Sequence, residues 1–221
     1  MEYTKIKTNY YYEFLKRVID ISFTLIFILI FLPIVISVAI AIKLDSPGPI
    51  FADTPERVGK GGKRFKMYKF RSMIQNAHKM LREDPKYAQL YHDYKKSSYK
   101  LKDDPRITPV GSFIRRHSLD EVPQFFNVLK GEMSIVGPRA YYPDELEDQQ
   151  KKYPYTRKSV KIVLSVKPGI TGLWQVSGRS DINFDKRIKL DAQYVKKRSI
   201  LHDMWIIMKS PWVMISGRGA L

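Results

Sequence analysis

Residues 21–42 read ISFTLIFILIFLPIVISVAIAI, an apolar stretch of 22 residues without a charged side chain. A run of this length is longer than most core helices of soluble domains, and it matches the hydrocarbon thickness of a bilayer. We therefore expect the chain to meet a membrane through this segment.

A cleaved signal peptide is one alternative, because Ala39-Ile40-Ala41 resembles a cleavage site. The apolar stretch is too long for such a peptide and contains Pro33, and the acids Glu2, Glu13 and Asp20 lie where a basic leader would stand. We therefore interpret residues 1–44 as an N-terminal membrane anchor.

Pro33 divides the apolar segment into arms of roughly 18 and 14 Å, each about one leaflet long. Positive side chains flank both ends of the segment, and such flanks favour the cytoplasmic side of a membrane. These two observations predict a re-entrant, monotopic helix that enters the bilayer, breaks at Pro33 and returns. A kinked helix that spans the bilayer is the remaining alternative. The flanking cations are Lys5, Lys7, Lys16 and Arg17 before the segment, and Lys43, Arg57, Lys60, Lys63 and Arg64 after it.

The composition limits the class of partner. The 221 residues include 39 Lys or Arg against 22 Asp or Glu, a formal net charge of +17. Such an excess favours an anionic partner, which is nucleic acid, an acidic membrane surface or a phosphorylated substrate. The hydrophobic content of 44% excludes a disordered basic tail. The absence of cysteine excludes a disulfide scaffold and a cysteine nucleophile, and the four histidines lack the spacing of a zinc site.

The remainder of the chain predicts a mostly helical α+β fold, in which one compact domain (residues 45–221) follows the turn-rich sequence SPGP at 46–49. A strand is expected within 59–72 behind a glycine turn, another at 133–136, and a short extended piece among loops at 167–179. The helix over 202–216 carries Trp205 and Trp212, and it suits either a core helix or an interfacial helix with both rings at headgroup depth. The other expected helices are 74–83, 86–96, 110–117, a helix between Ser118 and the stop at Gly131, 142–153 and 185–197.

Two adjacent carboxylates, Asp120 and Glu121, are the first candidates for chemistry. Acids at the start of a helix are most often caps, and Ser118 with Glu121 matches a capping box, while Asp120 as the cap would better suit Pro123. By itself, therefore, the pair favours a structural interpretation.

Cations beside glycine turns are the second candidates. They recur in separate segments, a distribution that suits convergence on phosphate groups, where arginine forks and backbone donors act together. A Mg²⁺ ion bound by one or two carboxylates and the substrate's phosphates would leave almost no trace in the sequence. The cations are Lys63, Arg64, Lys66, Lys69 and Arg71 in the expected strand, then Arg115, Arg116, Arg139 and Arg179.

Several short blocks follow one another in a fixed order along the chain. They are KRVID (16–20), DSPGPIF (45–51), KMYKFRSM (66–73), DDPRITPVGSFIRRHSLDEVPQFFNVLKGEMSIVGPR (103–139), KPGITGLWQVSGR (167–179) and GRGAL (217–221). Together these blocks resemble the bacterial sugar transferase family, the monotopic polyprenyl-phosphate phosphoglycosyl transferases. The resemblance implies transfer of a sugar 1-phosphate from a UDP-sugar to undecaprenyl phosphate, with release of UMP and a requirement for Mg²⁺. It also implies that residues 45–221 form a catalytic domain on the cytoplasmic face of the bacterial inner membrane, where capsule, exopolysaccharide or O-antigen synthesis begins.

The resemblance also implies roles for single residues. Asp120 resembles the family's nucleophile, and Glu121 resembles the partner that helps to place the metal, with Asp120 as a second ligand. Arg139 matches the arginine of a Pro-Arg-Pro phosphate-binding motif, although Ala140 replaces the second proline. The remaining assignments are Lys69, Arg71 and Arg115 to substrate phosphate, and Gln175 and Arg179 to the nucleotide.

Two alternatives without catalysis are a membrane-tethered nucleic-acid-binding protein and a scaffold for anionic lipids. Neither has a use for the acidic pair, so we expect the partners to be the two substrates and membrane lipids, and not nucleic acid. The sequence leaves the sugar open, with a preference for glucose or galactose over an N-acetylated sugar, and it leaves homo-oligomer formation open.

Overall fold

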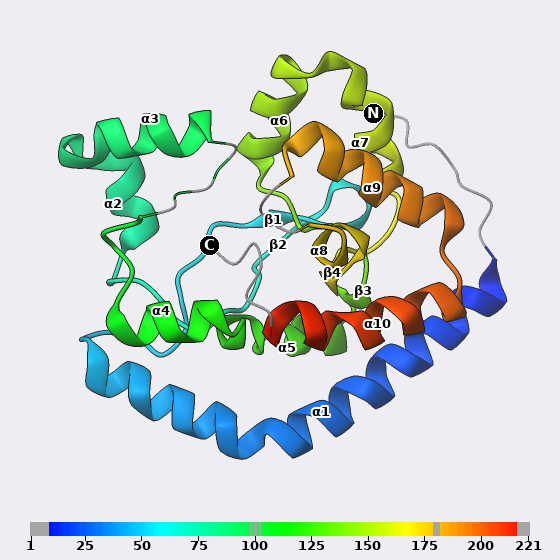
Figure 1. Ribbon diagram of the computed structural model, residues 1–221, viewed down its shortest axis with the longest axis horizontal. Coiled ribbons are helices and arrows are strands. Elements are labelled where there is room, and N and C mark those ends of the chain that lie inside the picture. Colours follow the sequence, from blue (N-terminus) through cyan, green and yellow to red (C-terminus); the bar gives the residue numbers. More distant parts are fainter. Residues whose placement is uncertain (1–8, 98, 100, 102, 179–181, 216–221) are drawn as a thin grey trace.

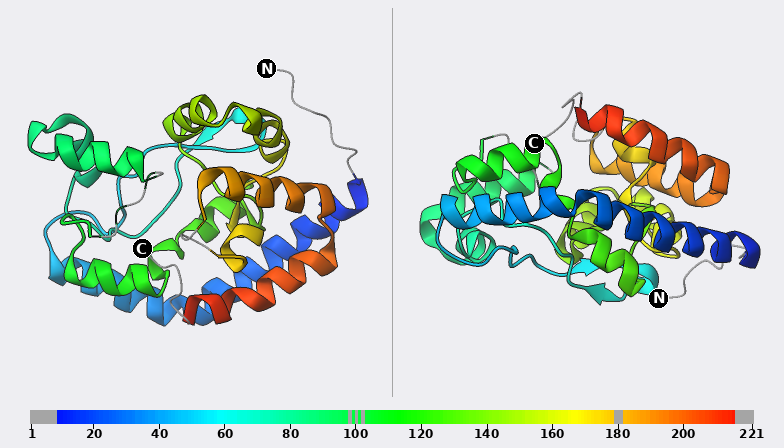
Figure 2. Two further views of the ribbon diagram at one scale, coloured as in Figure 1. Left: turned by 45° about the horizontal axis from the view of Figure 1, so that its top comes forward. Right: turned by 90° about the horizontal axis from the view of Figure 1, so that it is seen from below.

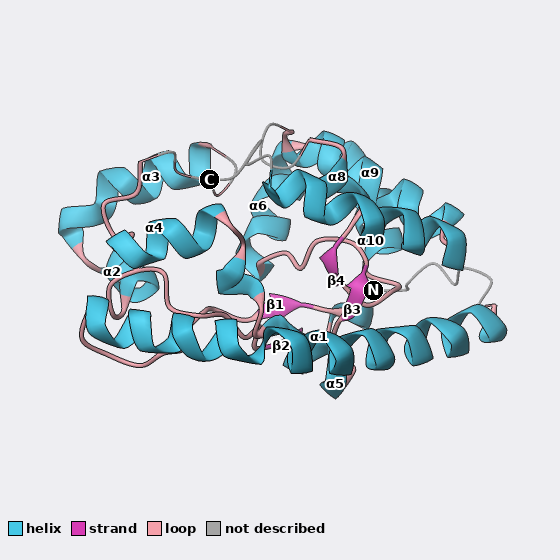
Figure 3. Ribbon diagram, turned by 60° about the horizontal axis from the view of Figure 1, so that its bottom comes forward, coloured by secondary structure: helices cyan, strands magenta, loops and turns pink. Residues whose placement is uncertain are grey.

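The computed structural model describes residues 9–97, 99, 101, 103–178 and 182–215. Helices dominate this part of the chain, and short strands lie near its centre (Figure 3), as the sequence predicts. The helices are α1 (Tyr10–Asp45), α2 (Ala77–Glu83), α3 (Ala88–Lys96), α4 (Pro109–Arg116), α5 (Gln124–Lys130), α6 (Pro143–Lys152), α7 (Arg157–Val163), α8 (Leu173–Val176), α9 (Phe184–Lys197) and α10 (Ile200–Ile215). The 3-10 helices are η1 (Lys60–Gly62), η2 (Pro85–Tyr87), η3 (Leu119–Glu121) and η4 (Pro154–Thr156), and the strands are β1 (Arg57–Val58), β2 (Arg64–Phe65), β3 (Ser134–Val136) and β4 (Gly169–Thr171).

The predicted elements differ from the structure in several places. The strand expected within 59–72 is an antiparallel hairpin of β1 and β2, followed by an extended segment that forms isolated bridges. The helix expected between Ser118 and Gly131 is divided into η3 and α5, because Pro123 has no backbone N–H to donate and precedes the first residue of α5. The extended piece expected within 167–179 is β4, but neither the helix α8 that follows it nor the helix α7 before it was predicted.

The apolar segment forms the single long helix α1 of 36 residues, which is long and apolar enough to cross a membrane by length and composition. Helical geometry continues through Pro33, and the helix is bent in its middle part (Figure 1). A proline removes one hydrogen bond and crowds the preceding turn, but the neighbouring turns keep their own bonds. The break predicted at Pro33 therefore takes the form of a bend in a continuous helix.

The first half of α1 is hydrogen-bonded to the domain. Arg17 donates to the carbonyls of Val128 (2.6 Å) and Leu129 (2.9 Å), near the C-terminus of α5. Asp20 is buried and accepts hydrogen bonds from the hydroxyl of Ser134 and the backbone N–H of Ile135, both at 3.0 Å. Because these two residues belong to β3, the helix is tied directly to the strand that leads to Arg139.

The second half of α1 packs against the same domain. Val38 and Ile42 are buried with Phe70 and with Ile114 of α4 in a small apolar cluster. Both halves of the bent helix therefore contact one domain, and α1 runs across it with α10 on one side and α5 on the other (Figure 2, right).

The main core surrounds the parallel pair β3–β4, in which Ser134 lies opposite Gly169 and Val136 opposite Thr171. The two segments approach so closely that a Cβ on Gly169 would stand 2.0 Å from the backbone nitrogen of Gly137. This contact places the turn after β3, which contains Arg139, beside the segment that leads into α8.

A continuous set of exposed apolar side chains accompanies α1. Its outward residues include Leu29 (76% exposed) and Leu44 (83%), and α10 adds Met208 and Trp212. Since Ile206 of the same helix is fully buried, α10 packs into the core on one side and exposes apolar side chains on another, and an interfacial role for its rings stays a prediction. The elements that carry this surface, α1, α4, α5 and α10, lie along one side of the molecule (Figure 1). The exposed aromatic rings on α4 and α5 are Phe113 and Phe126.

Candidate active site

A cavity of about 330 Å³ opens beside η3 and brings together segments that are far apart in the sequence. Its walls come from the linker after α1, the extended segment after β2, the end of α4, η3, the turn after β3 and the segment from β4 to α8. Arg179 lies outside the described residues. The other residues to which the resemblance assigns a role in the site all line this cavity: Lys69, Arg71, Arg115, Asp120, Glu121, Arg139 and Gln175. The further candidate cations Lys63, Arg64, Lys66 and Arg116 do not line it.

The two carboxylates are presented by a sharp turn. Ser118 adopts the left-handed conformation (φ 56°), which ends α4 and starts η3. The backbone N–H of Phe70 donates to the carbonyl of Asp120 at 2.9 Å and fixes η3 against the extended segment. Neither η3 nor α5 has a side-chain cap, so the capping roles considered for Ser118 and Asp120 are not formed. This removes the capping explanation for the acidic pair.

Lys69 bridges both carboxylates. Its Nζ lies 3.2 Å from Oδ2 of Asp120 and 2.8 Å from Oε1 of Glu121. The Asp120 side chain is only 10% exposed, whereas that of Glu121 is 36% exposed. Burial raises the pKa of Asp120, and the charge of Lys69 opposes that rise. The lysine therefore stabilises the ionised form of a buried carboxylate.

Arg139 lies in the turn after β3. Its backbone N–H donates to Oδ2 of Asp191 at 3.1 Å, and its guanidinium lies over the ring of Trp174 at 5.2 Å. Its buried Nε has no hydrogen-bond partner among the described residues, so the side chain retains a donor beside the cavity. An arginine with an unused donor in a basic cavity suits recognition of an anionic group.

The next two residues of this turn are held from outside. The carbonyl of Ala140 accepts from Nη1 of Arg57 at 3.1 Å, and the carbonyl of Tyr141 accepts from the N–H of Val58 at 2.9 Å. Because Asp191 also accepts a hydrogen bond from the backbone N–H of Arg139, the three consecutive residues 139–141 are each held by a hydrogen bond. The chain thus holds this turn in place with Ala140 in the position of the second proline.

Arg71 is committed elsewhere. Its guanidinium donates to the carbonyls of Ile42, Ser46 and Pro47, at and beyond the C-terminus of α1. The last carbonyls of a helix have no partner within it, so a buried arginine there satisfies groups that would otherwise be unpaired. Arg71 thus ties the anchor to the site, and its contact with a substrate phosphate stays a prediction.

The two remaining predicted residues differ in what they offer. Arg115, at the end of α4, also lowers the pKa of Asp120. Its effect is smaller than those of burial, Lys69 and Glu121. Gln175 donates from Nε2 to the carbonyl of Ile170 at 3.0 Å, and its buried Oε1 has no partner in the described part of the chain. That oxygen can accept a hydrogen bond from a ligand in the cavity.

Sequence reasoning did not single out Arg57 and His78 as cavity residues. The Arg57 guanidinium stacks on the ring of Tyr142 at 3.2 Å, and burial and then Arg57 lower the pKa of His78 to about 4. Arg57 follows Glu56 and precedes no motif, and His78 is a single histidine in a helix. Nothing in the sequence could have indicated either of them.

The cavity offers carboxylate oxygens to a divalent cation. Among the described residues, no three His, Asp or Glu side chains gather so as to hold a metal by themselves. Mg²⁺ commonly takes only one or two protein carboxylates and completes its ligands with water and phosphate. Asp120 and Glu121 supply two carboxylates on the cavity wall, next to a cation that they already stabilise, so the residues present fit Mg²⁺ in the company of a phosphorylated substrate.

Comparison with known proteins adds a family. The model described as bacterial sugar transferase matches residues 11–217. The chain is 42% identical over 207 residues to the undecaprenyl-phosphate galactose phosphotransferase of Salmonella typhimurium, a match that covers 94% of this chain and 42% of the relative. It is 38% identical over 213 residues to the UDP-N-acetylgalactosamine-undecaprenyl-phosphate N-acetylgalactosaminephosphotransferase of Aeromonas hydrophila, covering 95% of this chain and 45% of the relative.

A third relative has a similar length. The exopolysaccharide production protein ExoY of Sinorhizobium fredii is 37% identical over 205 residues, which cover 93% of this chain and 87% of that protein. The chain thus spans less than half of the first two relatives and most of the third.

Proposed function

Because the chain belongs to the bacterial sugar transferase family, we propose that it transfers a hexose 1-phosphate from a UDP-sugar to undecaprenyl phosphate and releases UMP. The observation that carries this proposal is the buried Asp120, paired with Lys69 at 3.2 Å, on the wall of a cavity lined by arginines. The names of the relatives support the two substrates, and the site supports the chemistry.

The proposed mechanism has two steps. An Oδ atom of Asp120 attacks the phosphorus that bears the sugar, the bond between the two phosphates breaks, and UMP leaves with the electron pair. An oxygen of undecaprenyl phosphate then attacks the same phosphorus and releases the Asp120 carboxylate, which completes the sugar-linked diphosphate. One phosphate pocket thus serves a water-soluble donor and a lipid acceptor in turn.

The electrostatics of the cavity suit this reaction. A carboxylate that attacks a diphosphate meets repulsion, so positive charge directed at the phosphoryl oxygens is needed. Arg139 has a free donor there, while the charge of Lys69 favours the ionised form of Asp120. Mg²⁺, bound through Glu121 and Asp120 together with the phosphates, would neutralise further negative charge.

The packing of α1 supports a re-entrant anchor on the cytoplasmic face of the bacterial membrane. Residues on both sides of the apolar segment, Arg17 and Lys43, lie against the same domain or its linker. A straight span would carry its two ends to opposite sides of the bilayer. A bent helix with both ends on one domain instead keeps the cavity at the depth of lipid headgroups, where the acceptor phosphate lies.

We expect both ends of α1 to face the cytoplasm, and the absence of native cysteine permits a direct test. Single cysteines in the exposed positions of Tyr10→Cys and Lys60→Cys should resist an impermeant thiol reagent added to spheroplasts, and both should react after permeabilisation. Labelling of the Tyr10→Cys protein before permeabilisation would instead establish a spanning helix.

The activity itself is tested by UMP release from a panel of UDP-sugars with undecaprenyl phosphate and Mg²⁺. We expect release with one hexose donor and the appearance of its sugar phosphate on the lipid. Relatives of similar identity are named for galactose and for N-acetylgalactosamine, so both donors belong in the panel with UDP-glucose. Absence of UMP with every donor would contradict the proposal.

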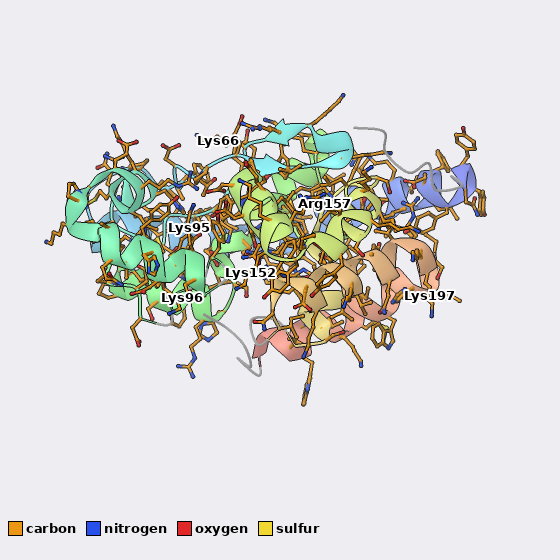
Figure 4. The ribbon with its side chains drawn as sticks, turned by 90° about the horizontal axis from the view of Figure 1, so that it is seen from above. Lys66, Lys95, Lys96, Lys152, Arg157 and Lys197 are labelled. Atoms are coloured by element: carbon orange, nitrogen blue, oxygen red, sulfur yellow. The ribbon has the colours of Figure 1, made fainter. Side chains whose placement is uncertain are left out.

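The alternatives without catalysis draw less support from the charge distribution. Figure 4 shows Lys96, Lys152, Arg157 and Lys197 spread over the face seen from above, on the helices α3, α6, α7 and α9. Lys95 on that face is paired with Asp148 at 3.0 Å. A dispersed, partly paired set of cations is typical of a solvated surface, and an Asp120 variant would leave binding by such a surface unchanged.

A further inference from the structure

The linker after α1 forms one wall of the cavity. It pairs with the extended segment that carries Lys69, because the N–H of Ala52 donates to the carbonyl of Lys69 (2.9 Å) and that of Arg71 to the carbonyl of Ile50 (2.8 Å). This pairing sets Phe51 opposite Phe70, whose own N–H binds the carbonyl of Asp120. Backbone hydrogen bonds thus hold Phe51 close to the acidic pair, with Phe70 between them.

The Phe51 ring has no role in the core. It stacks on Phe70 with the ring centroids 5.7 Å apart and an interplanar angle of 4°. Phe70 is 3% exposed, whereas Phe51 is 51% exposed and lines the cavity together with Asp120. A buried ring therefore supports an exposed one on the wall of the cavity that holds the acidic pair.

The apolar surface of the anchor leads to this ring. Ile36, Ile40 and Leu44 are exposed along the last turns of α1, and Phe51 follows Asp45, the last residue of that helix, after a short linker. The linker leaves the end of α1 and passes α4 on its way to β1 (Figure 1). Pro49, between Leu44 and Phe51, also lines the cavity.

We propose that Phe51 and Pro49 bind the first isoprenoid units of the acceptor lipid and guide its phosphate toward Asp120. This inference rests on the proposed function and adds the place where the lipid chain enters. The UDP-sugar offers one uracil ring and otherwise polar groups, whereas the acceptor joins a long apolar chain to a phosphate. An exposed ring a few residues beyond the apolar helix α1, on the wall of the cavity, complements the chain of the second substrate.

The two half-reactions separate this role from others. With Phe51→Ala, the burst of UMP in the absence of lipid should stay within about twofold of the unmodified protein, because the first step needs no acceptor. The KM for undecaprenyl phosphate should rise about tenfold, the effect of one lost aromatic contact with an apolar chain. The preference for undecaprenyl phosphate over the short farnesyl phosphate should shrink, and Phe51→Leu should restore most of it.

Phe126→Ala is the matched control, because Phe126 is also 51% exposed, lies on α5 and does not line the cavity. An equal rise in KM for that variant would assign the effect to general membrane contact and overturn the inference. Loss of the UMP burst in Phe51→Ala would show that the ring contacts the UDP-sugar. An unchanged KM for undecaprenyl phosphate would show that the ring does not bind the acceptor. Either result would overturn the inference. Absence of both half-reactions in the unmodified protein would instead remove the proposed function itself, and the inference with it.

Discussion

Replacement of Asp120 with asparagine is expected to abolish the burst of UMP and overall turnover together, with a loss of about a thousandfold or more. The amide keeps the size of the side chain and its ability to accept a hydrogen bond, but it removes the nucleophilic charge. Since Asp120 caps no helix, the variant should fold and should unfold near the temperature of the unmodified protein.

The decisive measurement is made without lipid. The unmodified protein with UDP-sugar and Mg²⁺ should release UMP in an amount equal to the enzyme, and the peptide that contains Asp120 should gain the mass of a sugar phosphate. Asp185→Asn serves as the control, because Asp185 accepts a hydrogen bond from the hydroxyl of Tyr155 and does not line the cavity. If UMP appears only with both substrates present and no adduct is trapped, transfer is direct and Asp120 acts as a base or a metal ligand.

Replacement of Lys69 with glutamine is expected to reduce the rate of the UMP burst at neutral pH by about a hundredfold and to shift the acidic limb of its pH profile upward. Burial already raises the pKa of Asp120, and Lys69 gives the largest opposing effect. Without Lys69, burial and the repulsion from Glu121, which both raise the pKa of Asp120, are opposed mainly by the smaller effect of Arg115. The pKa of Asp120 therefore rises further. The reactive carboxylate is then lost at a higher pH as the solution is acidified.

Activity should therefore recover in part as the pH is raised, which a purely structural loss would not do. Lys66→Gln is the control, because Lys66 is paired with the exposed Asp53 at 2.9 Å and its side chain is 57% exposed. An acidic limb at the same pH in the Lys69 variant would show that the lysine does not control ionisation of Asp120.

Residues in the same sequence block have different fates in the structure. Lys69 and Arg71 are two positions apart, so a regular strand would place them on one face. In the structure, Lys69 reaches the carboxylates of η3, while Arg71 turns to the carbonyls at the end of α1. The sequence block predicted a shared role in phosphate binding. The unpaired carbonyls at the end of α1 instead bind Arg71, so of these two residues only Lys69 reaches the carboxylates.

Local patterns were most informative where a short stretch carries its own physical constraint. The apolar segment, its charged flanks and the turn after it predicted a membrane helix joined to one compact, mostly helical domain, because solvation of side chains and backbone acts residue by residue. The adjacent carboxylates and the ordered motif blocks identified the candidate nucleophile and the family that the comparisons confirm.

Only the tertiary structure decided which side chains meet. The pairing of the linker with the extended segment brings Phe51 beside Phe70, and the close contact of Gly137 with Gly169 brings Arg139 beside Trp174. Arg57 enters the cavity because β1 hydrogen-bonds to the turn after β3, a contact between residues more than eighty positions apart. Such contacts arise from packing and from the need to pair buried polar groups across the whole core, and no local pattern in the sequence encodes them.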